Sequence, residues 1–124
     1  MMKTAPLVLV IDDDPDICTM ISVMLEYNSY EVRTAEGDSE AFAVINTNPV
    51  KLIIMDMLLS GIDGRDICRN LKSDPATSSI PVIMFSAHPN AKETCIAAGA
   101  DDFIAKPFEM SELLEKVNEK IDFS

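Results

Sequence analysis

The sequence predicts an α/β fold in which helices cover both faces of a parallel five-stranded sheet. Short apolar runs alternate along the chain with segments whose apolar residues recur at helical spacing. Four runs are apolar nearly throughout, which is typical of strands buried on both faces. Because strands joined through a helix form right-handed crossovers, the sheet should be parallel and doubly covered. With 124 residues, the chain is expected to be one domain, 1–124.

The first elements are marked by an apolar run and a helix start. Residues 7–11 (LVLVI) predict a buried strand. Asp14 and Pro15 are typical of an N-cap and a first helical position, and apolar residues at helical spacing extend this helix to about Tyr27. Residues 30–34 alternate between polar and apolar side chains, so we expect a strand at an edge of the sheet.

The middle of the chain continues the alternation. A helix is expected over 37–46 and a buried strand over 51–55, with Asp56 directly after it. A short helix beginning at Asp63-Gly64 should place Ile67, Cys68 and Leu71 inward. A polar loop is predicted over 72–79.

The last third of the chain should hold two strands and two helices. Strands are expected over 81–85 and 102–105, with a helix of small residues between them that stops at Gly99. The final helix should turn Leu113, Leu114, Val117 and Ile121 inward. The four apolar strands are expected to be central and the 30–34 strand to lie at an edge.

Composition limits the function classes. Ten basic and 21 acidic residues give a net charge of −11, which disfavours direct nucleic-acid binding and suits cations or a basic partner. No apolar segment approaches the roughly 20 residues that span a bilayer, so we expect a soluble cytoplasmic protein without membrane contact. Cys18, Cys68 and Cys95 fit neither a disulfide framework nor a metal site, and should pack as small apolar side chains.

Polar side chains follow four of the predicted strands. Asp12 and Asp13, Asp56, Ser86 and Lys106 stand at strand ends, where ligands bind in open α/β sheets. Three of them have an ordinary alternative: a solvated carboxylate for Asp56, a helix cap for Ser86 and a solvated ammonium for Lys106. Metal binding is favoured for Asp12 and Asp13, which directly follow a buried strand. Asp14 and Asp16 are best explained as helix-cap acids. Together, a carboxylate nucleophile, acids that suit Mg²⁺, a hydroxyl and an ammonium meet the needs of phosphoryl transfer.

Five short motifs carry a family resemblance along nearly the whole chain: residues 10–14 (VIDDD), 53–59 (IIMDMLL), 62–64 (IDG), 85–87 (FSA) and 99–108 (GADDFIAKPF). With these motifs, in this order and spacing, the chain resembles the receiver domain of two-component response regulators. The resemblance implies a flavodoxin-like, doubly wound sheet with strand order 2-1-3-4-5 and five helices. It also implies a phosphorylated signalling switch that assists its own chemistry and is not a dedicated enzyme.

The resemblance also implies residue roles. Asp56 would accept phosphate from a sensor histidine kinase or phosphotransfer protein. Asp13, Asp56 and the backbone carbonyl of Leu58 would bind Mg²⁺ (or Mn²⁺) directly, and Asp12 would bind it through water. Lys106 would contact the phosphoryl group, with a cis peptide to Pro107.

Output would depend on a switch pair. Ser86 is the implied switch hydroxyl and Phe103 the aromatic that follows it, although Phe103 is more simply a core residue on sequence alone. Their movement would change a face that binds a downstream protein effector, with candidate residues Ala87, Asn90, Lys92, Phe103 and Phe108.

Three departures from the family pattern stand near these sites. Ser60 stands where the family often has proline, which suggests a looser loop; Ser86 and Phe103 replace a commoner threonine and tyrosine. Leu58 and His88 occupy positions that tune phosphate lifetime in the family, although His88 is more simply a loop residue before Pro89.

Rival functions lack key residues. A haloacid-dehalogenase-type phosphatase would need a second acid where Leu58 stands, and a flavin phosphate would be repelled by residues 12–14. The glycine fingerprint of dinucleotide-binding units is missing. The remaining alternative is a degenerate receiver that acts as an unphosphorylated protein-protein interaction module. The sequence leaves open the kinase, the signal, the output, and whether the domain stands alone or comes from a longer protein.

Overall fold

The computed structural model describes residues 5–121, and the ends of the predicted domain, 1–4 and 122–124, lie outside the described residues. Its main sheet is parallel, with strand order β2-β1-β3-β6-β7. In sequence order among the sheet strands this is 2-1-3-4-5, so the predicted topology is confirmed. The strands are β1 (Leu7–Ile11), β2 (Glu31–Ala35), β3 (Val50–Asp56), β6 (Val82–Ser86) and β7 (Asp102–Ala105).

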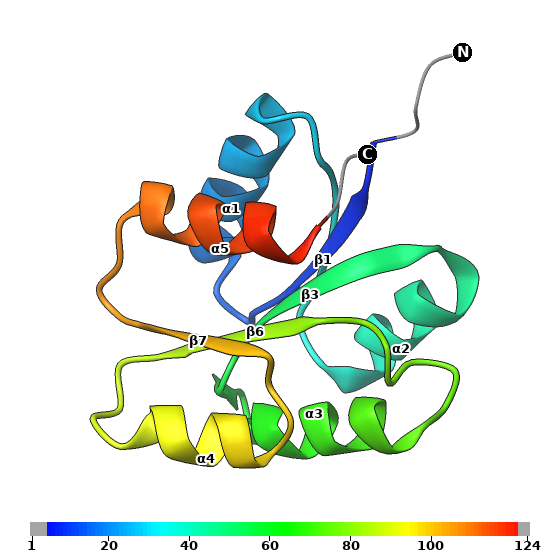
Figure 1. The fold of residues 1–124 in the computed structure, drawn as a ribbon, viewed down its shortest axis with the longest axis vertical. Helices are drawn as coiled ribbons and strands as arrows, with labels where there is room; N and C mark the ends of the chain where they lie inside the picture. Colours follow the sequence, from blue (N-terminus) through cyan, green and yellow to red (C-terminus); the bar gives the residue numbers. More distant parts are fainter. Residues whose placement is uncertain (1–4, 122–124) are drawn as a thin grey trace.

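Helices cover both faces of this sheet, as predicted. Helices α1 and α5 lie on one face, and α2, α3 and α4 lie on the other (Figure 1). The helices are α1 (Pro15–Tyr27), α2 (Asp38–Thr47), α3 (Gly64–Ser73), α4 (Ala91–Ala97) and α5 (Met110–Lys120).

The strand pattern explains the two covered faces. Alternate residues of each strand point to opposite faces, so Ile53 and Met55 join the core under α2, α3 and α4. Leu52 and Ile54 join the core under α1 and α5. Nearly every side chain of β1 and β3 is therefore buried, and each large apolar one stabilises the fold by about 1.5–3 kcal/mol.

Local signals place helix α1. The Asp14 side chain accepts a hydrogen bond from the Asp16 N–H at 2.9 Å, and Pro15 occupies the first turn. Cys18, Ile21 and Leu25 form the buried stripe of this helix. Because that stripe packs on β1, the start of α1 is held beside the residues that follow the strand.

Two predictions were wrong: the position of β7 within the sheet and the residue at which α3 ends. β7 lies at the second edge of the sheet, because an open five-stranded sheet has two edges and β2 occupies only one. Helix α3 also continues to Ser73, into the predicted polar loop.

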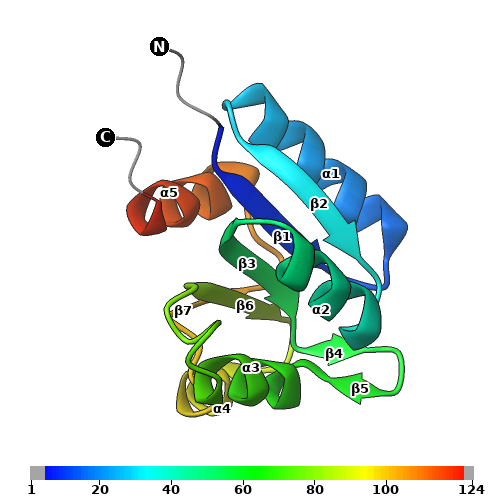
Figure 2. The ribbon, with the colours of Figure 1, turned by 90° about the vertical axis from the view of Figure 1, so that its right-hand side faces the viewer.

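The structure adds a small hairpin that the sequence did not predict. β4 (Leu58–Leu59) and β5 (Ile62–Asp63) pair antiparallel around the dipeptide Ser60-Gly61. Figure 2 shows this hairpin projecting from the end of β3 before the chain enters α3. The stretch expected to be loose is thus a defined turn.

Within residues 5–121, no helix is both long enough and apolar enough to cross a membrane. Cys18, Cys68 and Cys95 are buried free thiols in helices, as predicted. Burial raises the pKa of the Cys18 and Cys68 thiols to about 11, so both remain protonated at neutral pH.

Candidate functional site

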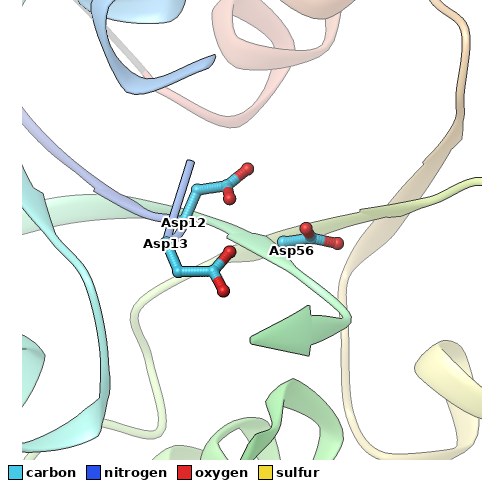
Figure 3. A group of neighbouring side chains, drawn as sticks. All are labelled: Asp12, Asp13 and Asp56. Carbon is cyan, nitrogen blue, oxygen red and sulfur yellow. The ribbon is translucent and has the colours of Figure 1, made fainter. Parts of the chain in front are cut away.

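The site forms where β1 and β3 end side by side. Ile11 pairs with Met55, so the next residues of both strands leave the sheet at the same edge. One oxygen from each of Asp12, Asp13 and Asp56 lies within 4.8 Å of the others. Figure 3 shows these three side chains gathered at the strand ends. The sequence prediction that the acids come together is confirmed.

Asp12 is the most deeply placed of the three acids. Its side chain is buried, and Oδ1 accepts the Asp14 backbone N–H at 2.9 Å. Oδ2 is buried and has no hydrogen-bond partner among the described residues. Burial is the main reason that the pKa of Asp12 rises to about 6, and repulsion from Asp56 adds to it.

Asp13 lies nearer the rim, half-buried. The Ser60 hydroxyl, from the tip of the β4-β5 hairpin, donates a hydrogen bond to Asp13 Oδ2. This bond is the main reason that the pKa of Asp13 is lowered. Sequence reasoning gave Ser60 no role. The sequence marks Ser60 only as a residue where the family often has proline and as part of a Ser-Gly turn dipeptide between Leu58-Leu59 and Ile62-Asp63.

Asp56 ends β3 with a side chain that is only 14% exposed. Lys106 Nζ lies 3.5 Å from Asp56 Oδ2, and the Leu58 N–H makes a long contact of 3.4 Å with Oδ1. Burial raises the pKa of Asp56, and the positive charge of Lys106 opposes that rise. The Asp56 carboxylate therefore lies close to both the two acids and an ammonium.

Lys106 reaches Asp56 from the far side of β6. Its backbone N–H donates to the Ser86 carbonyl at 2.9 Å, which fixes the chain where β7 ends. The Lys106-Pro107 peptide is cis, as the resemblance implied. The ammonium lies 4.8 Å from the centre of the Phe85 ring, within the range of a cation-π contact.

Ser86 lies at the end of β6 and is buried. Its Oγ accepts the His88 backbone N–H at 3.0 Å in the turn before α4, whose N-cap is Asn90, so Ser86 does not cap that helix. A hollow of about 470 Å³ opens between Asp56, Ser86 and Lys106, and Leu58 and His88 also line it. The hollow gives a phosphoryl-sized group room beside Asp56.

Phe103 lies outside the hollow, whereas Leu58 lines it. Phe103 is half-buried, packs on the core under α2, α3 and α4, and does not line the hollow. It pairs in register with Met84, whose side chain shares a face of β6 with that of Ser86. Leu58 exposes 58% of its surface beside the hollow, and the metal-binding role of its carbonyl stays a prediction.

The oxygen atoms of the acid cluster suit the cation that the resemblance implies. Three carboxylates supply oxygen atoms only, which suits a hard divalent ion such as Mg²⁺. The unpartnered Oδ2 of Asp12 is a buried acceptor that a bound water or cation would satisfy. The residues present therefore fit Mg²⁺.

Comparison with known families identifies the fold and the family. A sequence model described as the response regulator receiver domain matches residues 8–118. The chain belongs to this family. Receiver domains are signalling switches of two-component systems rather than dedicated enzymes.

Curated relatives of this receiver domain include longer transcriptional regulators. The present chain is 39% identical over 112 residues to the phosphate regulon transcriptional regulatory protein PhoB of Pseudomonas aeruginosa. The match covers 89% of this chain and 49% of PhoB. The chain is 35% identical over 114 residues to the DNA-binding dual master transcriptional regulator RpaA of Synechocystis, covering 90% of this chain and 47% of RpaA. The chain spans about half the length of these relatives.

Solved structures show the same fold. Chemotaxis response regulator CheY4 of Vibrio cholerae matches with a TM-score of 0.86 and 28% identity, covering 95% of this chain and 100% of CheY4. The receiver domain of sensor histidine kinase PA1611 of Pseudomonas aeruginosa matches with a TM-score of 0.84 and 26% identity, covering 94% of this chain and 97% of that one. The PA1611 structure holds a magnesium ion in its active-site cleft.

Proposed function

We propose that this receiver domain accepts a phosphoryl group on Asp56 in a Mg²⁺-dependent transfer from a phosphohistidine. The observation that carries the proposal is the position of Asp56, which has a carboxylate oxygen within 4.8 Å of oxygens of Asp12 and Asp13 and lies 3.5 Å from Lys106 Nζ. A carboxylate close to both a candidate cation site and an ammonium has near it both of the charges that a transferring phosphoryl group needs.

The transfer exchanges one bond for another. An Asp56 carboxylate oxygen attacks the phosphorus, the phosphorus–nitrogen bond of the donor breaks, and its electron pair returns to the donor imidazole. Lys106 lies 3.5 Å from the attacking carboxylate, so it offsets negative charge that gathers on the phosphoryl oxygens.

Asp13, Asp56 and the Leu58 carbonyl would hold Mg²⁺ directly, and Asp12 would hold it through water. When bound, the ion would neutralise the acids and the incoming phosphoryl oxygens. Asp12 is itself held in place, because its Oδ1 accepts the Asp14 N–H, and its buried Oδ2 has no hydrogen-bond partner among residues 5–121.

The phosphoryl group would then act as a switch. Ser86 lines the same hollow as Asp56, and its hydroxyl accepts the His88 N–H without using its own hydrogen, so that hydrogen is available to a phosphoryl oxygen. Phe103 lies on the same face of the sheet, and its movement would follow that of Ser86. The surface of α4, β7 and α5 would change its affinity for a protein effector.

A surface for the phosphohistidine protein lies beside the site. An apolar hollow of about 400 Å³ adjoins Lys106 between the start of α1 and the chain before α5. Its apolar lining residues are Ile17, Met20, Ala87, Pro107, Phe108 and Met110. Because a donor must approach Asp56 across this edge, we expect it to cover this hollow.

The partners proposed are therefore proteins: a histidine kinase or phosphotransfer protein upstream and an effector downstream. With a net charge of −11, this segment itself is poorly suited to the phosphate backbone of DNA. We propose that it works in the cytoplasm, where such kinases present their phosphohistidines.

The test of this function uses Mg²⁺ and acetyl phosphate with the intact chain. Mass spectrometry should show the gain of one phosphoryl group that is stable to acid, labile to base and absent in Asp56→Asn. Asp16→Asn, which changes an exposed acid of α1, is the matched control and should be phosphorylated like the wild type.

The same experiment distinguishes the proposed function from that of a degenerate receiver. A wild-type chain that takes up no phosphoryl group with Mg²⁺ would contradict the proposal and favour an unphosphorylated interaction module. For the switch, partner binding should change with phosphodonor in the wild type and stay constant in Asp56→Asn.

A further inference from the structure

We propose that Ser60 is a positioning residue for Mg²⁺, because it fixes the Asp13 carboxylate in the orientation that the ion needs. This inference rests on the proposed function of the acidic site. It concerns a residue outside the acid set, located at the tip of the β4-β5 hairpin.

The hairpin places Ser60 over the metal-binding edge. Leu59 pairs with Ile62 and Leu58 with Asp63, so Ser60 and Gly61 are the two residues of the turn. Gly61 has a φ of +72°, which glycine adopts without strain. The turn directs the Ser60 hydroxyl to Asp13 Oδ2 across 47 positions of sequence.

This contact joins the two segments that carry the proposed ligands. Asp12 and Asp13 follow β1, whereas Asp56 ends β3 and Leu58 begins the hairpin. Each carboxylate has its own orienting donor: the Asp14 N–H for Asp12, Lys106 for Asp56 and the Ser60 hydroxyl for Asp13. The donor to Asp13 differs from the other two because it is a side-chain hydroxyl on an exposed turn residue, rather than a backbone N–H or an ammonium.

The bond orients Asp13 without occupying its metal-binding capacity. A carboxylate has two oxygens and about four lone-pair directions. Ser60 uses Oδ2, so Oδ1 remains available to a cation. An outer partner of this kind holds a ligand in place, and its removal typically weakens metal affinity by about 10–100-fold.

Removal of the hydroxyl should therefore weaken Mg²⁺ binding. We expect Ser60→Ala to raise the dissociation constant for Mg²⁺ about 10-fold, the lower end of that range, because the turn is exposed. Ser60→Thr keeps the hydroxyl and should restore affinity to within about 2-fold of the wild type. Ser79→Ala, an exposed serine before β6 at the other end of the sheet, is the matched control.

Isothermal titration calorimetry with MgCl₂ alone measures these constants on the intact chain. Circular dichroism and the unfolding midpoint in EDTA verify that each variant is folded. In an Asp13→Asn background, Ser60→Ala should produce no further loss of affinity. With acetyl phosphate, the Ser60→Ala deficit should shrink as Mg²⁺ approaches saturation, which separates an effect on ion binding from one on the chemical step.

Two results would overturn the role of Ser60. One is a folded Ser60→Ala chain that binds Mg²⁺ as tightly as the wild type or more tightly, which would mean that the hydroxyl is neutral or competes with the ion. The other is Ser60→Thr binding as weakly as Ser60→Ala. Failure of the wild type itself to bind Mg²⁺ and take a phosphoryl group would instead overturn the proposed function.

Discussion

The ammonium of Lys106 lies 3.5 Å from Oδ2 of Asp56, although β6 separates the strands that carry the two residues. The contact spans the edge of the sheet because Lys106 follows β7 and its side chain passes over the Phe85 ring of β6. Its side chain is 28% exposed and that of Asp56 is 14% exposed, so water screens this pair only in part. We expect this ion pair to affect the rate of phosphorylation of Asp56 more than the free energy of unfolding.

Replacing the ammonium should slow phosphorylation more than it changes folding. We expect Lys106→Ala to lower the rate of phosphoryl gain from acetyl phosphate at saturating Mg²⁺ by about 100-fold, because a charge that stabilises the transition state is removed. Timed mass spectrometry measures this rate. Lys116→Ala is the control, since Lys116 pairs with Asp102 at 3.1 Å and lies outside the site. Equal rates in Lys106→Ala and Lys116→Ala would contradict the role of Lys106.

Asp12 should make the metal-free protein less stable as pH rises. Its pKa is about 6 in the folded chain and 3.8 as the ordinary value, so the folded state holds the extra proton between these pH values. The free energy of unfolding therefore falls from about pH 4 to pH 6 and stays lowered above it, by up to about 3 kcal/mol. Burial is the main cause, because the charged carboxylate loses water and its Oδ2 gains no hydrogen-bond partner within residues 5–121.

Urea unfolding in EDTA between pH 4.5 and 7.5 measures this effect. Asp12→Asn cannot ionise, so it should be more stable than the wild type at pH 7.5 and lose that advantage toward pH 4.5. Other acids titrate in both proteins, and the difference between the two isolates Asp12. A stability difference that is the same at every pH would show that Asp12 does not titrate as proposed.

Most of the fold could be predicted because its signals are local and strong. Continuous apolar runs predicted β1, β3 and β6, and Asp14-Pro15 predicted the start of α1 at the right residue. The β4-β5 hairpin was missed because two-residue strands are too short to show periodicity. β7 was expected to be central because its sequence is apolar, but the order of the strands decides which of them has a neighbour on both sides.

Some features of the site could likewise be predicted from the sequence and others could not. Asp12, Asp13 and Asp56 could be predicted to meet, since residues after neighbouring parallel strands leave at one edge. The Ser60 contact could not be predicted, because it depends on the direction of one hydroxyl at a turn. The empty acceptor on Asp12 also depends on burial of a single oxygen atom.

Gly64 should be essential to the geometry of Asp56. A Cβ at Gly64 would lie 2.4 Å from the Asp56 carbonyl oxygen and 3.0 Å from that of Met57, and the Gly64 N–H donates to Met57 at 2.6 Å. Because both obstacles are backbone atoms, Gly64→Ala must move the end of β3. We expect a loss of about 2–3 kcal/mol in the free energy of unfolding.

Gly61→Ala provides the comparison for that substitution. Gly61 has a φ of +72°, but no atom of the described residues lies within 4 Å of an added Cβ. Its cost should therefore be limited to about 1 kcal/mol of backbone strain. Urea unfolding of both variants measures the difference, and a Gly64→Ala chain that is at least as stable as Gly61→Ala would contradict the close approach.

The apolar hollow beside Lys106 should matter to a protein donor and not to a small one. Met20 lines the hollow and is 52% exposed, so Met20→Glu would place a charge in the surface that the donor covers. We expect its transfer rate from a phosphorylated histidine kinase to fall about 10-fold, as for a residue near the centre of an interface. Its rate with acetyl phosphate should match the wild type, because Met20 does not line the hollow at Asp56. Tyr27→Glu, about two turns farther along α1 at a residue that is 89% exposed, tests the same charge outside the hollow. If both variants slow the kinase reaction equally, net charge rather than the hollow governs docking, and the proposed donor surface is wrong.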